Sequence, residues 1–338
     1  MTNGTDFGYY LTKYLSHYLP EQMNASKNTA LAYRDTFLLL LGYLERVRKL
    51  SPDKLTVAGI DVGLVVDFLS WLESERGCSI SSRNHRLAII RAFFKYLQFE
   101  EPKYLAYCQA ILGIRHKKTS SKSPEFLSGE AIAAILAEPD ARTEDHYRDL
   151  MLLSLMYDTG ARVQEVCDLR VCDVKLQEFP SITLTGKGNK TRNVPIMQKT
   201  ATMMAHYISK FLSNETPGTP LFRNHAKKKL TRNGITYLLK KYAGQARKKA
   251  PYLLPDKVTP HMLRHSKAVH LVQSGVNIIY IRDFLGHANI RATEIYARAD
   301  GEMKRAALAK AGEKKVISAR QAWNKDTGLV DWLKGFGK

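Results

Sequence analysis

Apolar residues before position 116 recur at intervals of three and four, the spacing of one face of an α-helix. The pattern runs through residues 31–44 and again through residues 64–72. A third segment, residues 82–97, keeps its apolar positions on one side and places Arg83 and Arg86 elsewhere. Strand signals are nearly absent here, so this region predicts a small helical bundle.

The pattern changes in the second part of the chain. Between Ile182 and Ile196 the period becomes two, with Gly186-Lys-Gly188-Asn between the arms, which predicts a β-hairpin. Helical spacing is found in segments 128–136, 147–157, 200–212 and 234–248, and again after Pro255. This part therefore predicts helices around a small β-sheet.

The resulting fold class is mainly α with a small β-sheet or hairpin. Residues 115–124 are polar, basic and closed by a proline, as expected of an exposed linker. We expect an all-helical domain at 1–118, a linker at 119–124 and a mixed α+β domain at 125–300. Residues 301–338 form a tail too short to be a domain.

The charge of the chain favours a polyanionic partner. Its 52 Lys and Arg residues outnumber 32 Asp and Glu residues, which gives a formal net charge of +20. The excess is +5 over residues 1–118 and +15 over residues 119–338. Residues 222–249 hold ten Lys and Arg residues and no acidic one. Such a run is either a solvated helix face or, as we favour, a surface for nucleic-acid phosphates.

Composition disfavours several other classes of protein. The four cysteines form no CxxC pair, so neither a disulfide framework nor a cysteine-rich zinc site is indicated. No apolar run reaches the ~18 residues of a membrane span. The first ten residues lack the basic and apolar regions of a signal peptide. We therefore expect a cytoplasmic, nucleoid-associated protein without a membrane partner.

Arg162 follows Thr159-Gly160-Ala161 and stands at the predicted start of a helix. Free backbone N–H groups and the positive end of the helix dipole favour an anion there, and the guanidinium would add a bidentate clamp. Glu165, one turn later, is placed to orient it. The alternative is an arginine in an ordinary surface ion pair.

A second helix start is predicted at Thr259-Pro260, because threonine is a good cap and proline fits the first helical position. His261 and Arg264 are three residues apart, so they share a face and can reach one phosphate. The competing interpretation is a metal site made of His261 and His265. Met262 stands where a zinc protease needs glutamate, so we expect no metal.

The segment 270–286, with Gly275 between two apolar stretches, imitates a helix-turn-helix DNA reader. Apolar residues dominate its second helix, however, so we expect that helix to be buried. His287 follows Leu285-Gly286 at the end of this helix. Taken alone, such a histidine is a structural cap.

Two further residues have the chemistry of phosphoryl transfer. Tyr296 stands on a short predicted helix at 288–297, and its phenol, with an ordinary pKa of about 10, needs positive groups nearby to become a nucleophile. Lys187 lies at the tip of the hairpin, where a mobile ammonium could protonate a leaving oxygen. This turn is not a nucleotide-binding loop, because Gly188 replaces the Ser or Thr required.

The ordered set of motifs resembles the tyrosine recombinases, also called phage-type integrases. The resemblance rests on Thr159-Gly-Ala-Arg162-x-x-Glu165, Gly186-Lys-Gly-Asn-Lys-x-Arg192-x-x-Pro195, His261-x-x-Arg264-His265, Leu285-Gly-His287 and Tyr296. All six catalytic positions of the family are matched. The resemblance covers the second domain, and the first domain is similar to the core-binding domain of the family by pattern only.

This resemblance implies a site-specific DNA recombinase or integrase, of which a transposase would be one form. Its catalytic residues would be Arg162, Lys187, His261, Arg264, His287 and Tyr296, supported by Glu165. Tyr296 would attack the scissile phosphate and leave 3′-phosphotyrosyl DNA with a free 5′-hydroxyl. The two arginines would hold the nonbridging oxygens, and Lys187 would protonate the leaving oxygen. His261 would exchange protons around the nucleophile, and His287 would bond a phosphate oxygen. No metal or nucleotide cofactor is expected.

The implied partners are double-stranded DNA and further copies of the chain in a tetrameric synaptic complex. The tail, 301–338, would dock on a neighbouring subunit or pack on its own domain. The candidates for phosphate contact are Arg83, Arg86, Lys227, Lys228, Lys229, Arg232, Lys240 and Lys241. Three alternatives stay open: DNA relaxation of the type IB topoisomerase kind, DNA binding without cleavage, and a metal-dependent phosphodiesterase.

Overall fold

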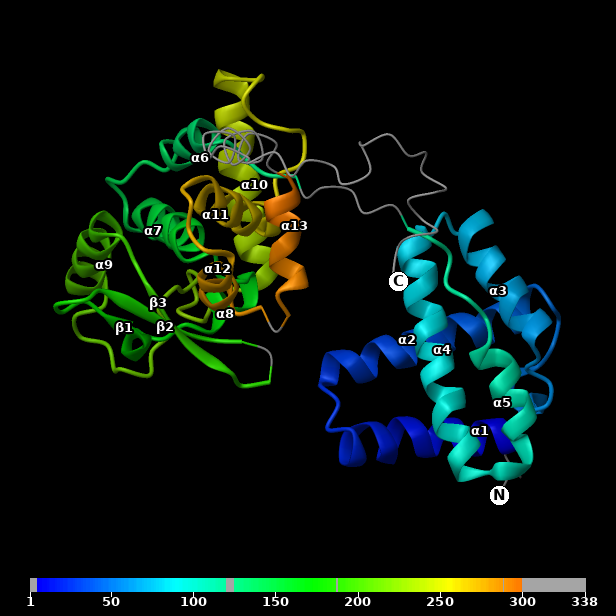
Figure 1. Cartoon of the computed structure of the whole chain (residues 1–338). Coiled ribbons are helices and arrows are strands. Elements are labelled where there is room, and N and C mark those ends of the chain that lie inside the picture. Colours follow the sequence, from blue (N-terminus) through cyan, green and yellow to red (C-terminus); the bar gives the residue numbers. More distant parts are fainter. Residues whose placement is uncertain (1–4, 120–124, 187, 288, 300–338) are drawn as a thin grey trace, which may run out of the picture. The chain divides into compact units, whose positions relative to one another are not determined.

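The computed structural model describes residues 5–119, 125–186, 188–287 and 289–299 of the 338. The chain divides into two compact units, Met1–Ser121 and Lys122–Lys338, drawn in Figure 1. Each unit has its own hydrophobic core. Lys187 and the tail at 301–338 lie outside the described residues.

The secondary structure in the described part of the first unit consists of helices, which confirms the predicted bundle. Its elements are α1 (Asp6–Lys13), the π-helix η1 (Tyr14–Gln22), α2 (Lys27–Arg46), η2 (Pro52–Lys54), α3 (Val62–Ser74), α4 (Ile80–Glu100), η3 (Pro102–Tyr104) and α5 (Leu105–Leu112). Side chains fix several starts: Ser26 caps α2, Asp61 caps α3 and Ser79 caps α4.

Aromatic rings fill the core of this unit. Phe93 of α4 lies edge-on to three other buried rings, those of Phe7, Tyr14 and Phe37. Such edge-to-face pairs add to the stability that apolar burial provides. Leu38, in the same apolar run as Phe37, is exposed, so the buried face of α2 is narrower than its sequence indicates.

The second unit combines helices with a small sheet. Its elements are α6 (Gly129–Leu136), α7 (Glu144–Thr159), α8 (Val163–Asp168), η4 (Val171–Asp173), β1 (Val174–Lys175), β2 (Ser181–Thr185), β3 (Thr191–Pro195), α9 (Gln198–Phe211), α10 (Arg232–Lys249), α11 (Pro260–Gln273), α12 (Ile278–Leu285) and α13 (Arg291–Ala299). Helix α7 contacts both α9 and α11, and in Figure 1 it lies between them.

The sheet has the order β1-β2-β3 and is antiparallel. The predicted hairpin is confirmed, with Ser181 opposite Pro195 and Thr185 opposite Thr191. Ile182, Leu184 and Val194 are buried and alternate with more exposed neighbours, as in a sheet with one face on the core. The sequence did not indicate β1, because two residues are too few to show alternation.

Helix α12 is less buried than its apolar composition suggested. Ile281 and Leu285 are fully buried, but Ile279 is 47% and Tyr280 is 70% exposed. The reason is geometric: the helix packs against α11 and α13, so only one side of it faces the core. Within the described ranges, no helix is both long and apolar enough to span a membrane.

Candidate active site

Arg162 lies at the start of α8, directly after a sharp turn that ends α7. Gly160 makes this turn in the left-handed conformation, with φ of +57°, and a Cβ atom there would lie 2.8 Å from Leu285 Cδ2. Arg162 Nη1 donates to Glu165 Oε1 at 2.9 Å, and its backbone N–H donates to Glu165 Oε2 at 2.8 Å. The carboxylate therefore fixes both the main chain and the guanidinium of Arg162.

Glu165 is itself held by a second arginine from the hairpin. Arg192 Nη1 and Nη2 donate to Oε1 and Oε2 of Glu165 at 2.9 and 2.8 Å, a bidentate pair. Burial raises the pKa of Glu165, but the hydrogen bonds from Arg192 and Arg162 outweigh it and leave the pKa below its ordinary value. A buried carboxylate thus stays ionised between two guanidinium groups.

Arg264 stands in the second turn of α11, whose start is fixed by Thr259 as cap and Pro260 as first residue. Its side chain is buried, with 4% of the residue exposed. Nη1 donates to the Gly160 carbonyl at 2.7 Å and Nη2 to the Leu285 carbonyl at 2.6 Å. Burial and the charge of Arg162 lower the pKa of Arg264 to about 10.

Three arginines converge on the carboxyl end of α12. The carbonyls of three consecutive residues, Phe284, Leu285 and Gly286, accept from Arg192, Arg264 and Arg162 respectively. The last carbonyls of a helix have no partner within it and form the negative end of its dipole, so they are suited to bind cations. This helix end therefore gathers arginines from β3, α11 and the start of α8.

Gly286 is required at this point. It has φ of +65°, and a Cβ atom would lie 2.8 Å from Arg192 Nη1. His287 follows, and its Nδ1 lies 2.9 Å from Thr293 Oγ1. Burial and the charges of Arg264 and Arg162 lower the pKa of His287 to about 4. The imidazole is therefore uncharged at neutral pH.

Tyr296 of α13 is enclosed, with 3% of the residue exposed. Its phenol oxygen lies 2.7 Å from His265 Nδ1. The ring is close to two imidazoles, with its centroid 5.5 Å from that of His265 and 6.2 Å from that of His287. Burial raises the pKa of Tyr296, while the charges of Arg264 and Arg162 oppose the rise.

The structure thus brings Arg162, Glu165, Arg264, His287 and Tyr296 into one connected site. His261 is exposed one turn before His265 on α11, with the two ring centroids 6.3 Å apart. Lys187 is outside the described residues, but its neighbour Gly186 is close: a Cβ there would lie 3.0 Å from Glu165 Oε1. The hairpin turn therefore abuts the site.

Two residues of this site had no role assigned from sequence. Arg192 appeared only as a letter of the hairpin motif, and His265 only as the last letter of the motif that holds His261 and Arg264 and as half of the metal alternative. The signal that could have identified both was their place inside the motifs that carry the other residues. Among the described residues no cluster of three or more His, Cys, Asp or Glu side chains could hold a metal ion.

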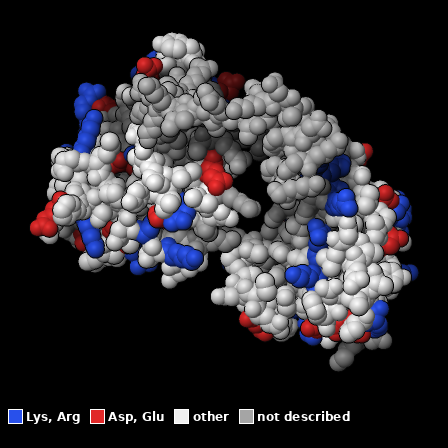
Figure 2. Space-filling view, viewed as in Figure 1, with Lys and Arg blue, Asp and Glu red and all other residues white. Residues whose placement is uncertain are grey.

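The predicted basic contacts differ in accessibility. Lys227, Lys228 and Lys229 are exposed in the loop before α10, and Arg232 and Lys240 are exposed on that helix. Lys241 is half-buried, with Nζ 4.9 Å from the ring centroid of Tyr242. In the view of Figure 2, both units present Lys and Arg side chains with acidic ones among them.

Arg83 does not fit its predicted role in phosphate binding. It is only 6% exposed, and Nε lies 3.1 Å from Glu73 Oε1 in an ion pair within the first unit. Arg86 is half-buried, and its Nη1 donates to Thr36 Oγ1 at 2.8 Å. Because Arg83 and Arg86 lie on the non-apolar side of a helix, the sequence predicted that both side chains would be exposed. In the structure, neighbouring helices cover that side.

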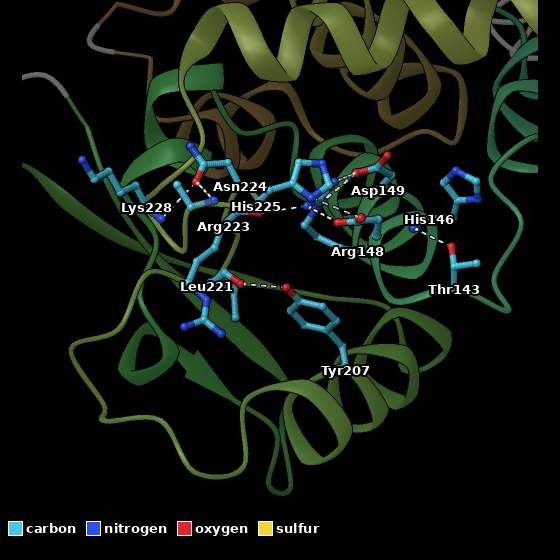
Figure 3. Close-up of polar contacts among 12 residues, drawn as sticks. Thr143, His146, Arg148, Asp149, Tyr207, Leu221, Arg223, Asn224, His225 and Lys228 are labelled. Atoms are coloured by element: carbon cyan, nitrogen blue, oxygen red, sulfur yellow. Dashed lines mark hydrogen bonds and ion pairs between the residues drawn. The ribbon is translucent and has the colours of Figure 1, made fainter.

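A network of hydrogen bonds that runs from buried Arg148 to exposed Asn224 supports the loop that carries Lys227, Lys228 and Lys229, the lysine loop, as Figure 3 shows. Arg148 of α7 donates to Asp149 Oδ1 through Nη2 at 2.8 Å and to the Arg223 carbonyl through Nη1 at 3.0 Å. Asn224 Oδ1 accepts from the backbone N–H of Ala226 and of Lys228, at 3.0 and 3.1 Å. These contacts fix the main chain that presents the lysines.

Comparisons with known proteins agree with this geometry. Residues 125–303 match the phage integrase family, and residues 11–101 match the phage integrase N-terminal SAM-like domain. A Sinorhizobium fredii protein named as an integrase/recombinase, y4rC, is 34% identical over 333 residues, which are 98% of this chain and 99% of the relative.

Solved structures share the fold. The XerH site-specific recombinase bound to difH substrate has 22% identity and a TM-score of 0.67, over 88% of this chain and 84% of XerH. A lambda integrase tetramer bound to a Holliday junction has 14% identity and a TM-score of 0.62, over 87% and 78% of the two chains. The chain belongs to the phage integrase family of tyrosine recombinases and is a site-specific DNA breaking and rejoining enzyme.

Proposed function

We propose that this recombinase cleaves double-stranded DNA through attack of Tyr296 on the scissile phosphate, which gives a 3′-phosphotyrosyl bond and a free 5′-hydroxyl. The bond energy is kept in the phosphotyrosine, so a 5′-hydroxyl of another strand reverses the step. The second unit would carry this chemistry at 125–300, and the helical unit at 1–118 would also bind DNA.

The convergence of Arg162, Arg264 and His287 beside Tyr296 carries the proposal. A scissile phosphate gains negative charge on its nonbridging oxygens in the transition state, and fixed cationic donors stabilise that charge. Arg162 is the more accessible arginine, with 36% of its side chain exposed. Arg264 is buried, and its positive charge would stabilise the phosphate from the protein interior. His287 would donate through Nε2, because Thr293 occupies its Nδ1.

The leaving 5′ oxygen needs a proton, and we assign its donation to Lys187. Support comes from Gly186, whose added Cβ would lie 3.7 Å from Arg162 Nη1, so the hairpin tip begins beside the phosphate clamp. A lysine ammonium is a mobile donor suited to this task. His261, exposed at the first turn of α11, would exchange protons with solvent around the nucleophile.

Strand exchange needs two duplexes and therefore several protomers. XerH has been solved on difH substrate, and lambda integrase has been solved as a tetramer on a Holliday junction. We propose the same arrangement here: four copies on two double-stranded sites, with the tail at 301–338 contributing to the contact between copies. No metal or nucleotide enters the reaction.

A covalent-adduct assay tests the function. DNA fragments retained by the protein are selected, rebuilt as nicked duplexes and incubated with it in chelator. We expect an adduct that resists denaturant. Peptide mass mapping of this adduct should locate the attached nucleotide on Tyr296. Adduct formation only with divalent metal would favour the phosphodiesterase, and plasmid relaxation without recombinant product would favour the topoisomerase. Attachment to another residue would contradict the assignment of Tyr296.

The lysine loop provides a separate prediction about binding. We expect the double substitution Lys227→Gln and Lys228→Gln to weaken DNA binding and to lower the slope of log affinity against log salt by about 2, one unit for each lysine that no longer neutralises a phosphate. Fluorescence anisotropy at several salt concentrations measures this slope. The control is Lys175→Gln with Lys210→Gln, which removes equal charge from exposed positions of the same unit. Equal slopes for the two pairs would contradict a specific role of the loop.

A further inference from the structure

The phenol of Tyr296 must lose its proton as its oxygen bonds to phosphorus, and the enclosed position of the residue limits where that proton can go. Only 3% of Tyr296 is exposed, so bulk water has little access to it. His265 Nδ1 lies 2.7 Å from the phenol oxygen, within hydrogen-bond distance. A proton acceptor in direct contact is therefore already in place.

The other two histidines of the site are less suited to this step. His287 has its Nδ1 engaged by Thr293 Oγ1, and its remaining nitrogen is assigned to the phosphate. His261 is exposed and lies one turn before His265 on α11. The ring centroids of these two histidines are 6.3 Å apart. Of these imidazoles, His265 is the one with a hydrogen bond to the nucleophile.

The surroundings of His265 keep it ready to accept a proton. Burial, together with His261 and Arg264 on the same helix, lowers its pKa, so the imidazole is neutral at neutral pH. His287, from the turn after α12, faces it as well. With the ring proton on Nε2, the Nδ1 lone pair accepts the hydrogen bond that the phenol donates.

We propose that His265 is a catalytic residue that accepts the phenolic proton of Tyr296 during cleavage. The inference rests on the proposed role of Tyr296 as nucleophile. In the step, the O–H bond breaks and its proton goes to His265 Nδ1, while the phenol oxygen bonds to phosphorus. The bond from phosphorus to the 5′ oxygen breaks, and that oxygen takes a separate proton from Lys187. In rejoining, His265 returns its proton to the departing phenolate.

The chain offers a matched control on the same helix. His270 is also half-buried in α11, and its Nδ1 lies 2.8 Å from the phenol oxygen of Tyr157. Burial lowers its pKa too. The two histidine–tyrosine pairs thus have similar geometry, but Tyr157 belongs to α7 and takes no part in the proposed chemistry.

The test compares His265→Asn with His270→Asn in single-turnover adduct formation on nicked DNA from pH 5 to pH 9. Asparagine keeps a hydrogen-bonding group near the position of Nδ1 but does not titrate. We expect His265→Asn to cleave about 100-fold more slowly or worse, the usual contribution of a proton-transfer group, while DNA retention and thermal unfolding change little. His270→Asn should cleave at the wild-type rate.

The pH profile separates a proton acceptor from a structural role. The wild-type rate should fall as the pH drops through the lowered pKa of His265, and His270→Asn should keep this fall. In His265→Asn the inflection at this pKa should vanish, leaving a rate that rises steadily with pH over the whole range, because the phenol, whose pKa is raised by burial, is only slightly ionised throughout. Should His265→Asn fail to fold, imidazole added to His265→Ala provides the second measurement, and we expect it to restore cleavage.

Three results would overturn the inference: an unchanged rate and profile in His265→Asn, an equal loss at every pH, or faster cleavage, which would make His265 a restraint on Tyr296. Each of these presupposes that the wild type forms the adduct. Absence of any wild-type adduct would instead contradict the proposed function itself.

Discussion

Tyr296→Phe is expected to form no covalent adduct with DNA while it retains DNA as the wild type does. Phenylalanine keeps the ring that packs with the buried cluster of α11 and α12, including Val269 and Leu285. It removes only the hydroxyl and its hydrogen bond to His265, at a cost of about 1 kcal/mol in stability. The variant should therefore fold, and its chemical defect should be complete.

Denaturing electrophoresis of nicked-site reactions measures the adduct, and a filter-retention assay measures binding. Tyr157→Phe makes the same chemical change at the other histidine–tyrosine pair and should leave adduct formation at the wild-type level. A full yield of adduct from Tyr296→Phe would mean that another residue is the nucleophile. Loss of DNA retention together with cleavage would point to misfolding, which thermal unfolding of the variant would reveal.

Local features of this protein were readable from the sequence because local interactions fix them. The cap at Thr259 and the turn at Gly160 set where α11 begins and α7 ends, and both follow from the preferences of single residues. The hairpin followed from alternation around Gly186 and Gly188. Positions within one helix turn, such as Arg162 with Glu165, were also predictable as neighbours.

The contacts that complete the site were not readable, because they join segments far apart in the chain. Arg192 reaches Glu165 and the end of α12 only once the hairpin has folded onto both. The same holds for His265 and Tyr296, 31 residues apart. Arg83 shows that a positive charge on the polar side of a helix does not guarantee exposure to solvent. Tertiary packing buries this residue in an ion pair with Glu73. Periodicity gives the face of a helix, but not which neighbour covers it.

Glu165→Gln is expected to destabilise the second unit by about 3–5 kcal/mol, because it leaves two buried or half-buried guanidiniums without their shared counter-charge. Urea unfolding at neutral pH measures the loss. The matched control is Asp283→Asn, whose exposed pair with Arg282 should be worth under about 1 kcal/mol. Cleavage should fall as well, since Arg162 loses the carboxylate that orients it.

The pH dependence of stability gives this prediction a sign. The folded-state pKa of Glu165 lies below its ordinary value, so its contribution is fully present above that ordinary value and is lost as the pH falls through the folded-state pKa. Glu165→Gln should therefore be closest to the wild type in acid and furthest from it at neutral pH. A double variant, Glu165→Gln with Arg192→Gln, should lose less stability than the sum of the two single losses. The reason is that Arg192→Gln removes a positive charge that Glu165→Gln alone leaves unpaired. Additive losses, or a difference from wild type that stays constant from acid to neutral pH, would show that Glu165 does not join the two arginines into one unit.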